Sequence, residues 1–116
     1  MSSRSDVVYL YDMLDSINAI EQFLAGFDYN SFVSDRKTYS ATLRELEIVG
    51  EAGGKLSDEV KTRHSEIDWR TLKDFRNVLA HEYFGVNSEI VWDVVVHKLP
   101  VLKELLEIMV RDEEKS

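Results

Sequence analysis

Cysteine is absent from this sequence of 116 residues, and proline occurs once. Disulfides and thiolate metal sites are therefore excluded. Glycine is also sparse, at five residues, which is few for a fold built of tight turns. No apolar run approaches the roughly 20 residues that a membrane span needs, and the N-terminus turns acidic at once, unlike a secretory signal. We expect one cytoplasmic domain over residues 1–116.

Positive charge is in the minority, with 14 basic and 22 acidic side chains and a net charge of −8. This balance argues against a protein that coats nucleic acid electrostatically. Residues 61–76, however, carry five basic and three acidic side chains, which leaves −10 on the rest of the chain. A solvated helix face explains this modest excess almost as well as a binding surface does.

Histidine spacing argues against a metal centre. His64, His81 and His97 lie 17 and 16 residues apart, with no cysteine and no H-x-x-x-H pair among them. A transition-metal site needs several such ligands close together. We therefore expect neither a metal nor a cofactor, and we interpret His64 and His97 as surface residues.

Apolar residues recur at three- and four-residue spacing in four stretches, which predicts four helices. The first runs from a cap at Ser5 or Asp6 to near Gly26, the second begins near Asp35, and residues 27–35 connect them. No strand-like alternation of useful length is present. The predicted fold class is all-α, an antiparallel bundle of four to five helices.

The later helices have clear boundary signals. Asp68 is a suitable N-cap for a third helix that begins at Trp69 and runs to about Phe84. Gly85 is its expected C-terminal stop. The fourth helix opens at Asn87 or Ser88. Its single proline, Pro100, should kink or divide it, because proline removes a backbone donor.

Gly50 and Gly53 continue the apolar stripe of Leu43 and Leu46 along the second helix. Each glycine costs about 1 kcal/mol in a helix relative to alanine, so a compensating reason is expected. One reason is close approach by another helix. The other is a break in the helix, after which Ser57 caps a separate short one.

Arg76 falls inside the apolar arc of the third helix, near Trp69 and Leu72 at about 100° per residue. Burying an unpaired charge is very costly, so this guanidinium must meet a carboxylate, an anion or a water-filled cleft. Geometry alone slightly favours an internal salt bridge, for example to Glu51 or Asp12. The other interpretation is a groove that binds an anionic ligand.

His81 lies five residues after Arg76, about 140° around the helix and ~7.5 Å along it, so a straight helix does not point both at one atom. A distorted helix end, a cleft across the helix shoulder or a second copy of the chain could complete a site. Asn77 shares a face with His81, and Tyr83 lies nearly in line with Arg76. These groups suit a phosphate, because arginine binds its oxygens bidentately and histidine exchanges protons near neutral pH.

Four aromatic residues accompany this segment. Their spacing matches core stripes, and nothing in the sequence places them in a groove. We interpret them as packing residues and not as platforms for stacking bases: Trp69, Phe75, Phe84 and Trp92.

The segment "RNVLAHEY" has the pattern R-x4-H-x-Y, formed by Arg76, His81 and Tyr83. R-x4-H alone would match many chains by chance, so its context matters. With "IVGEAGGKLSDEV" before it and "VWDVV" after it, the segment resembles the HEPN superfamily. The specific resemblance is to the HepT-like toxins, the ribonuclease halves of HEPN/MNT toxin–antitoxin pairs, and it covers nearly the whole chain.

The resemblance implies a homodimer in which two R-x4-H-x-Y motifs face a shared cleft, and a metal-independent endoribonuclease that acts on RNA. In the mechanism that we expect, His81 is the general base on a 2′-hydroxyl and Arg76 stabilises charge at phosphorus. Asn77 and Tyr83 hold the phosphate or orient the imidazole. Arg70 and Lys73 add local positive charge. A 2′,3′-cyclic phosphate is the expected product.

The resemblance also implies a partner. Tyr83 would accept AMP from a cognate MNT nucleotidyltransferase, the antitoxin of a type VII-like system, and the added AMP would silence the toxin. The alternative is a non-catalytic helical subunit that binds nucleotide or partner through Arg76 and His81. A purely structural bundle ranks third.

Overall fold

The computed structural model describes residues 4–81 and 85–115, and these form helices and no strand. The four long helices are α1 (Arg4–Leu24), α3 (Arg36–Gly54), α5 (Trp69–His81) and α7 (Leu99–Glu114). Between them lie α2 (Tyr29–Ser34), α4 (Asp58–Arg63), α6 (Ser88–Asp93) and a π-helical turn, η1 (Val94–Lys98). The predicted all-α bundle is confirmed, with the short helices added as connections.

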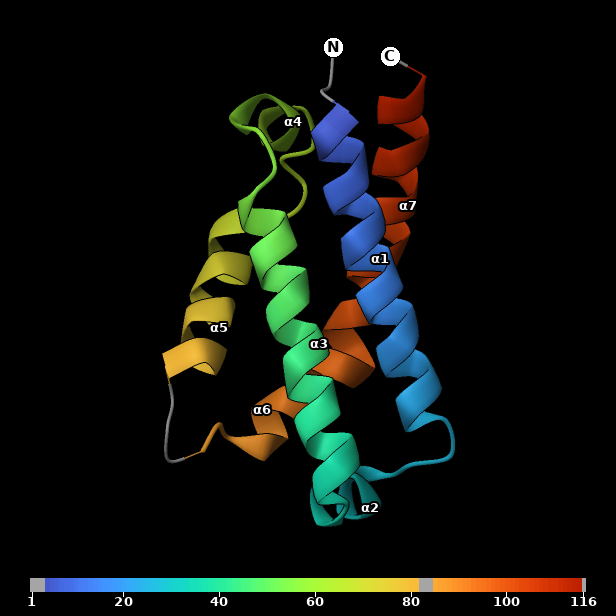
Figure 1. Cartoon of the computed structure of the whole chain (residues 1–116), viewed down its shortest axis with the longest axis vertical. Coiled ribbons are helices and arrows are strands. Elements are labelled where there is room, and N and C mark those ends of the chain that lie inside the picture. The colour runs from blue at the N-terminus through green and yellow to red at the C-terminus, as the bar shows by residue number, and fades with distance from the viewer. Residues whose placement is uncertain (1–3, 82–84, 116) are drawn as a thin grey trace.

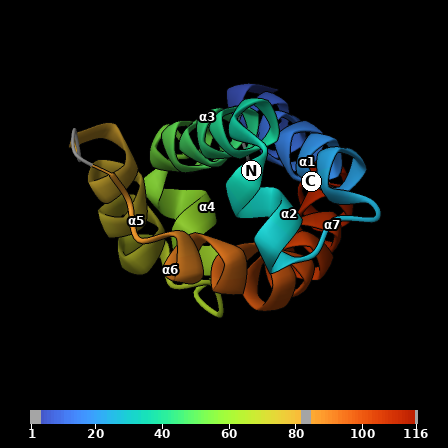
Figure 2. The same cartoon turned by 90° about the horizontal axis from the view of Figure 1, so that it is seen from below.

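The long helices pack as antiparallel neighbours in the order α5, α3, α1, α7 (Figure 1). Seen along the bundle, α5 lies at one side, against α3 and away from α1 (Figure 2). The core includes fully buried residues from α1, α3 and α7 and from the short helices α2, α4 and α6: Leu10, Met13, Ile17, Ile20, Phe32, Val49, Val60, Val91, Leu106 and Met109. Among the described residues, no helix is both long and apolar enough to cross a membrane.

Several predicted boundaries are confirmed by capping contacts. The Asp35 carboxylate accepts from the Thr38 N–H at 3.1 Å, and the Asn87 side chain accepts from the Glu89 N–H at 2.9 Å. Pro100 sits in the first turn of α7, directly after η1. The wider π-helical turn accommodates the missing proline donor, so the predicted division of the fourth helix is also confirmed.

The connection predicted over residues 27–35 is wrong in part, because it contains α2. Asp28 caps this helix by accepting from the Ser31 N–H at 2.8 Å, and the Ser31 hydroxyl contacts the Asp28 backbone in return. This reciprocal capping box satisfies two orphan groups of a very short helix. Phe32, which is fully buried, anchors it to the core.

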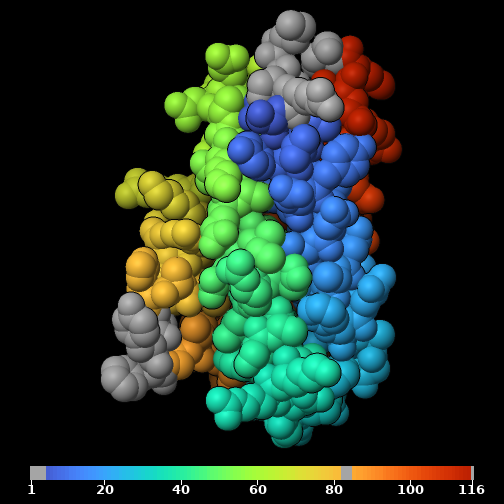
Figure 3. Space-filling view, in the orientation of Figure 1, coloured from blue at the N-terminus to red at the C-terminus, as the bar shows by residue number. Residues whose placement is uncertain are grey.

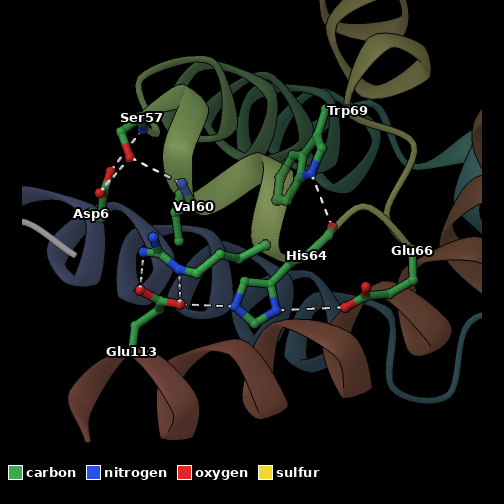
Figure 4. Close-up of polar contacts among 8 residues, drawn as sticks. Asp6, Ser57, Val60, His64, Glu66, Trp69 and Glu113 are labelled. Carbon is green, nitrogen blue, oxygen red and sulfur yellow. Dashed lines mark hydrogen bonds and ion pairs between the residues drawn. The ribbon is translucent and has the colours of Figure 1, made fainter. Parts of the chain in front are cut away.

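Asp6 is not a helix cap, because α1 begins before it, at Arg4. Its buried carboxylate instead accepts two hydrogen bonds from Ser57, each at 2.8 Å, from the backbone N–H and the hydroxyl (Figure 4). The Ser57 hydroxyl also accepts from the Val60 N–H at 3.2 Å, which confirms Ser57 as the cap of a separate short helix. Asp6 therefore ties α1 to the start of α4.

The surface prediction holds for His97 and is wrong for His64, which is only 6% exposed. Glu113, itself buried, lies 2.9 Å from His64 Nε2 and 2.6 Å from Arg63 Nη2 (Figure 4). The hydrogen bond to Glu113 raises the pKa of the Arg63 guanidinium. Burial of the Glu113 carboxylate is tolerable because the buried His64 and the exposed Arg63 both contact it. The cluster joins the end of α4 to α7.

Candidate active site

A groove of about 570 Å³ lies where the end of α3, α4 and the stretch of α5 from Trp69 to Asn77 meet. Figure 3 shows the face on which the green atoms of α3 lie beside the yellow atoms of α5. Eleven residues line the groove: Gly50, Glu51, Gly53, Gly54, Lys55, Lys61, Trp69, Leu72, Lys73, Arg76 and Asn77. Four of these are basic and one is acidic, so the groove is cationic in a chain of net charge −8.

Asp68 fixes the start of α5, as predicted, by accepting a hydrogen bond from the Thr71 N–H at 3.0 Å. This hydrogen bond lowers the pKa of the Asp68 carboxyl. A carboxylate at this end also complements the positive end of the helix dipole. The cap thereby sets the register in which α5 presents Lys73, Arg76 and Asn77 to the groove.

The two glycines of α3 let α5 approach closely. A Cβ built on Gly50 would overlap the Cβ and Cγ atoms of Arg76, and one on Gly53 would lie 2.9 Å from Leu72 Cδ2. Both proposed reasons for these glycines therefore apply, since α3 also ends at Gly54 and α4 is separate. The glycines place the Arg76 side chain directly against the α3 backbone.

The Arg76 guanidinium has only weak partners. Its Nη2 lies 3.8 Å from Glu51 Oε1, and its Nη1 donates to Asn77 Oδ1 at 3.3 Å. The predicted pairing with Glu51 is thus confirmed as a long contact, and Glu51 also lies 3.9 Å from Arg44. Because both side chains are more than a third exposed, this pair contributes little to stability.

The Arg76 Nε is buried and has no hydrogen-bond partner among the residues that the structure describes. An unsatisfied buried donor costs about 1–3 kcal/mol. Both interpretations of Arg76, as a salt-bridge partner of Glu51 and as a groove residue, therefore hold in part. The guanidinium contacts Glu51 and still faces the groove with capacity to bind an anion.

The structure brings together Arg76, Asn77 and Lys73 of the predicted site residues. Arg70 and His81 are exposed on α5 and do not line the groove. Tyr83 lies outside the described residues. On a straight helix, a spacing of five residues places the two side chains about 140° apart, so one copy of the chain does not direct both the imidazole and the guanidinium at one atom.

Sequence reasoning missed three groove residues. Lys61 belongs to the basic window, but nothing in the sequence marked it as lining the groove. Lys55 follows the glycine-containing end of α3, and Trp69 was assigned to packing alone. That packing role is confirmed, because Trp69 lies partly buried against the core, and the residue also lines the groove. Within residues 4–81 and 85–115, no three His, Asp or Glu side chains gather as metal ligands.

A family model described as "Ribonuclease HepT-like" matches residues 13–109. The chain belongs to the HepT-like ribonuclease family. It is 39% identical over 100 residues to "Probable ribonuclease HepT" of Thermococcus cleftensis, covering 86% of this chain and 91% of that protein. The resemblance inferred from R-x4-H-x-Y and its context is confirmed.

Two further relatives of this HepT-like chain come from Methanocaldococcus jannaschii. "Putative RNase MJ1380" is 33% identical over 109 residues, covering 94% of this chain and all of that protein. "Putative RNase MJ0127" is 36% identical over 108 residues, covering 91% and 89%. No solved structure matches the chain significantly.

Proposed function

We propose that this HepT-like protein is a metal-independent endoribonuclease and the toxin of a HEPN/MNT toxin–antitoxin pair. The observation that carries the proposal is the Arg76 guanidinium, which lines a cationic groove and makes only long contacts, to Glu51 at 3.8 Å and to Asn77 at 3.3 Å. A phosphodiester is the anion in RNA that such a group would bind bidentately. Family membership and the names of the relatives support RNA as the substrate.

In the proposed reaction, the His81 imidazole removes the proton of a 2′-hydroxyl, and the 2′-oxygen attacks the adjacent phosphorus. The bond from phosphorus to the 5′-oxygen breaks, and the same imidazole, now protonated, returns the proton to that oxygen. The products are a 2′,3′-cyclic phosphate and a 5′-hydroxyl. Arg76 stabilises the charge that develops on the phosphoryl oxygens. Asn77 and Tyr83 orient the phosphate or the imidazole, and Arg70 and Lys73 hold flanking phosphates.

The reaction requires a second copy of the chain, because Arg76 and His81 diverge within one. A two-fold axis beside α5 would place the His81 of one copy near the Arg76 of the other. Val78, on the same helix, is 47% exposed, and Ile90 of α6 is 54% exposed. Such apolar side chains are what a dimer interface would cover.

Total RNA incubated with the purified protein in EDTA tests the proposed activity. We expect cleavage at a rate unchanged by the chelator, because protein side chains supply every catalytic group. The new 3′ ends should be 2′,3′-cyclic phosphates. They are identified by treatment with a phosphatase that opens the cyclic ester. Absence of cleavage at any dose would instead support the alternative function, a subunit that only binds nucleotide or partner.

We also propose that a nucleotidyltransferase antitoxin silences the protein by modifying Tyr83. The phenol oxygen would attack the α-phosphorus of ATP, pyrophosphate would leave, and AMP would remain bonded to the tyrosine. Because AMP is bulky and anionic, it would block the groove and neutralise Arg76.

Co-expression with the cognate nucleotidyltransferase, followed by intact mass measurement, tests this modification. We expect mass increments of AMP that map to Tyr83 and are absent from Tyr83→Phe. A Tyr9→Phe variant is the matched control, since Tyr9 lies on α1 and should not affect the increment. Increments that persist in Tyr83→Phe would contradict the assignment.

A further inference from the structure

The groove extends well beyond Arg76, in the direction opposite to His81. From Arg76 to Trp69 the α5 axis runs about 10 Å toward the N-terminus, and α4 closes the far end of the groove. His81 lies on the other side of Arg76, nearer the C-terminus of α5. A ligand that fills the groove therefore reaches past the reacting phosphate on one side only.

Three lysines line this extension, from three different segments. Lys55 follows α3, Lys61 belongs to α4 and Lys73 belongs to α5. None of the three forms an ion pair with a residue that the structure describes, although Lys55 lies 5.7 Å above the ring of Tyr9. Unpaired ammonium groups at several points suit an anion whose charges are spread out.

Trp69 contributes an aromatic ring to the same groove. Its indole N–H donates to the His64 carbonyl oxygen at 3.2 Å, so this donor is already used (Figure 4). What Trp69 offers a ligand is therefore its ring surface. An indole ring among unpaired cations is the combination by which proteins bind bases and phosphates of a single strand.

The contact between His64 and Glu113 holds the Trp69 ring in place. The imidazole of His64 contacts Glu113 of α7 at 2.9 Å, and Arg63 binds the same carboxylate (Figure 4). The position of His64, and hence of the carbonyl that binds Trp69, is thus fixed from the far side of the bundle. A preorganised ring loses little entropy when a base stacks on it.

We propose that the extension is a nucleotide subsite for single-stranded RNA, in which a base stacks on Trp69 while Lys55 and Lys61 bind its flanking phosphates. This rests on the proposed function in placing the scissile phosphate at Arg76. A strand fits better than a mononucleotide, because cations lie at several points along the groove and not at one end. Substrate selection therefore begins one to two nucleotides from the cleaved bond.

Binding of a fluorescent 12-mer RNA with 2′-O-methyl groups at every sugar tests the lysines, since this strand cannot be cleaved through its 2′-oxygens. We expect Lys55→Gln/Lys61→Gln to raise the Kd severalfold and to lower the slope of log affinity against log salt by about 1.4, or about 0.7 per phosphate contact. The matched control is Lys37→Gln/Lys115→Gln, which removes the same charge from exposed positions outside the groove. Equal affinity of the two double variants would overturn the subsite.

Tryptophan fluorescence tests stacking separately from charge. The strand should quench emission in the wild type, and Trp69→Phe should abolish the change, because the remaining Trp92 lies outside the groove beside Phe32. An abasic strand of equal length should bind with less quenching. Equal quenching by polyphosphate, or tight lysine-dependent binding of AMP alone, would overturn the strand-binding proposal.

Failure of the subsite and failure of the nuclease assignment give different results. Lysine-dependent binding without any RNA cleavage would leave the subsite in place and remove the nuclease. Normal cleavage by both double variants, with equal affinity for the uncleavable strand, would remove the subsite and leave the nuclease assignment in place.

Discussion

Replacement of His81 with alanine is expected to lower the rate of RNA cleavage by about 10²–10⁴-fold, the range that a positioned general base contributes. His81 is exposed at the end of α5, and the described structure gives it no ion pair, so the variant should fold normally. Substitutions at such surface positions usually change stability by less than about 0.5 kcal/mol. The loss of activity should therefore appear in chemistry and not in folding.

The matched control is His97→Ala, which removes an exposed imidazole from η1, away from the cationic groove. Cleavage is measured with a labelled RNA in EDTA, and circular dichroism checks the fold of each variant. His97→Ala should cleave at the wild-type rate. Equal rates for wild type and His81→Ala would remove His81 from the mechanism and point to a contaminating nuclease.

Mixing two inactive variants tests whether the site is shared between copies. A dimer of Arg76→Ala with His81→Ala retains one Arg76 and one His81 on different chains. If these residues meet across a two-fold axis, the mixed dimer regains one intact site and about half of the wild-type activity. If both residues act within one chain, the mixed dimer stays inactive.

Local signals in the sequence predicted much of the fold. Capping by Asp35, Asp68 and Ser57 depends on side chains that bind a backbone N–H three residues on, so the pattern is contained in a few letters. The position of Arg76 on the apolar side of α5 follows equally from helical periodicity. The capping box at Asp28 was also local and was missed because serine, not glutamate, completes it.

Contacts between distant segments could not be predicted in this way. His64 is buried because Glu113, 49 residues later, accepts its hydrogen bond. Asp6 binds Ser57 across 51 residues. From one sequence, the carboxylates of Asp6 and Glu113 cannot be distinguished from solvated surface charges, because only the fold shows their partners. For the same reason, Lys55 and Lys61 were not predicted as groove residues, since only the fold brings their segments to the groove.

The site thus depends on two features that differ in origin. Periodicity places Arg76 toward α3, and the missing side chain of Gly50 allows it to lie there. The first feature was partly predictable from the sequence, because helical periodicity places Arg76 on the apolar side of its helix. The second was predictable only as one of two alternatives, since a helical glycine marks both close approach and helix ends.

Gly50→Ala is therefore expected to damage both stability and activity. The new Cβ would overlap the Cβ and Cγ of Arg76 and would lie 3.4 Å from its Cα. Atoms so near the backbone move only if α5 shifts away from α3. Overpacking of this kind costs about 1–3 kcal/mol, opposed by about 1 kcal/mol of improved helix propensity. Because the Arg76 guanidinium would be displaced, the fraction of the protein that remains folded should also lose RNA cleavage.

Gly54→Ala is the matched control, because a Cβ at this last residue of α3 meets nothing within 4 Å. Gly53→Ala should be intermediate, since the Cβ there meets the flexible ends of Leu72 and Met13. Urea unfolding followed by circular dichroism should rank the free energies of unfolding as Gly54→Ala above Gly53→Ala above Gly50→Ala. A Gly50→Ala protein as stable and active as Gly54→Ala would mean that α5 does not rest on this glycine in solution. The placement of Arg76 in the groove would then be wrong.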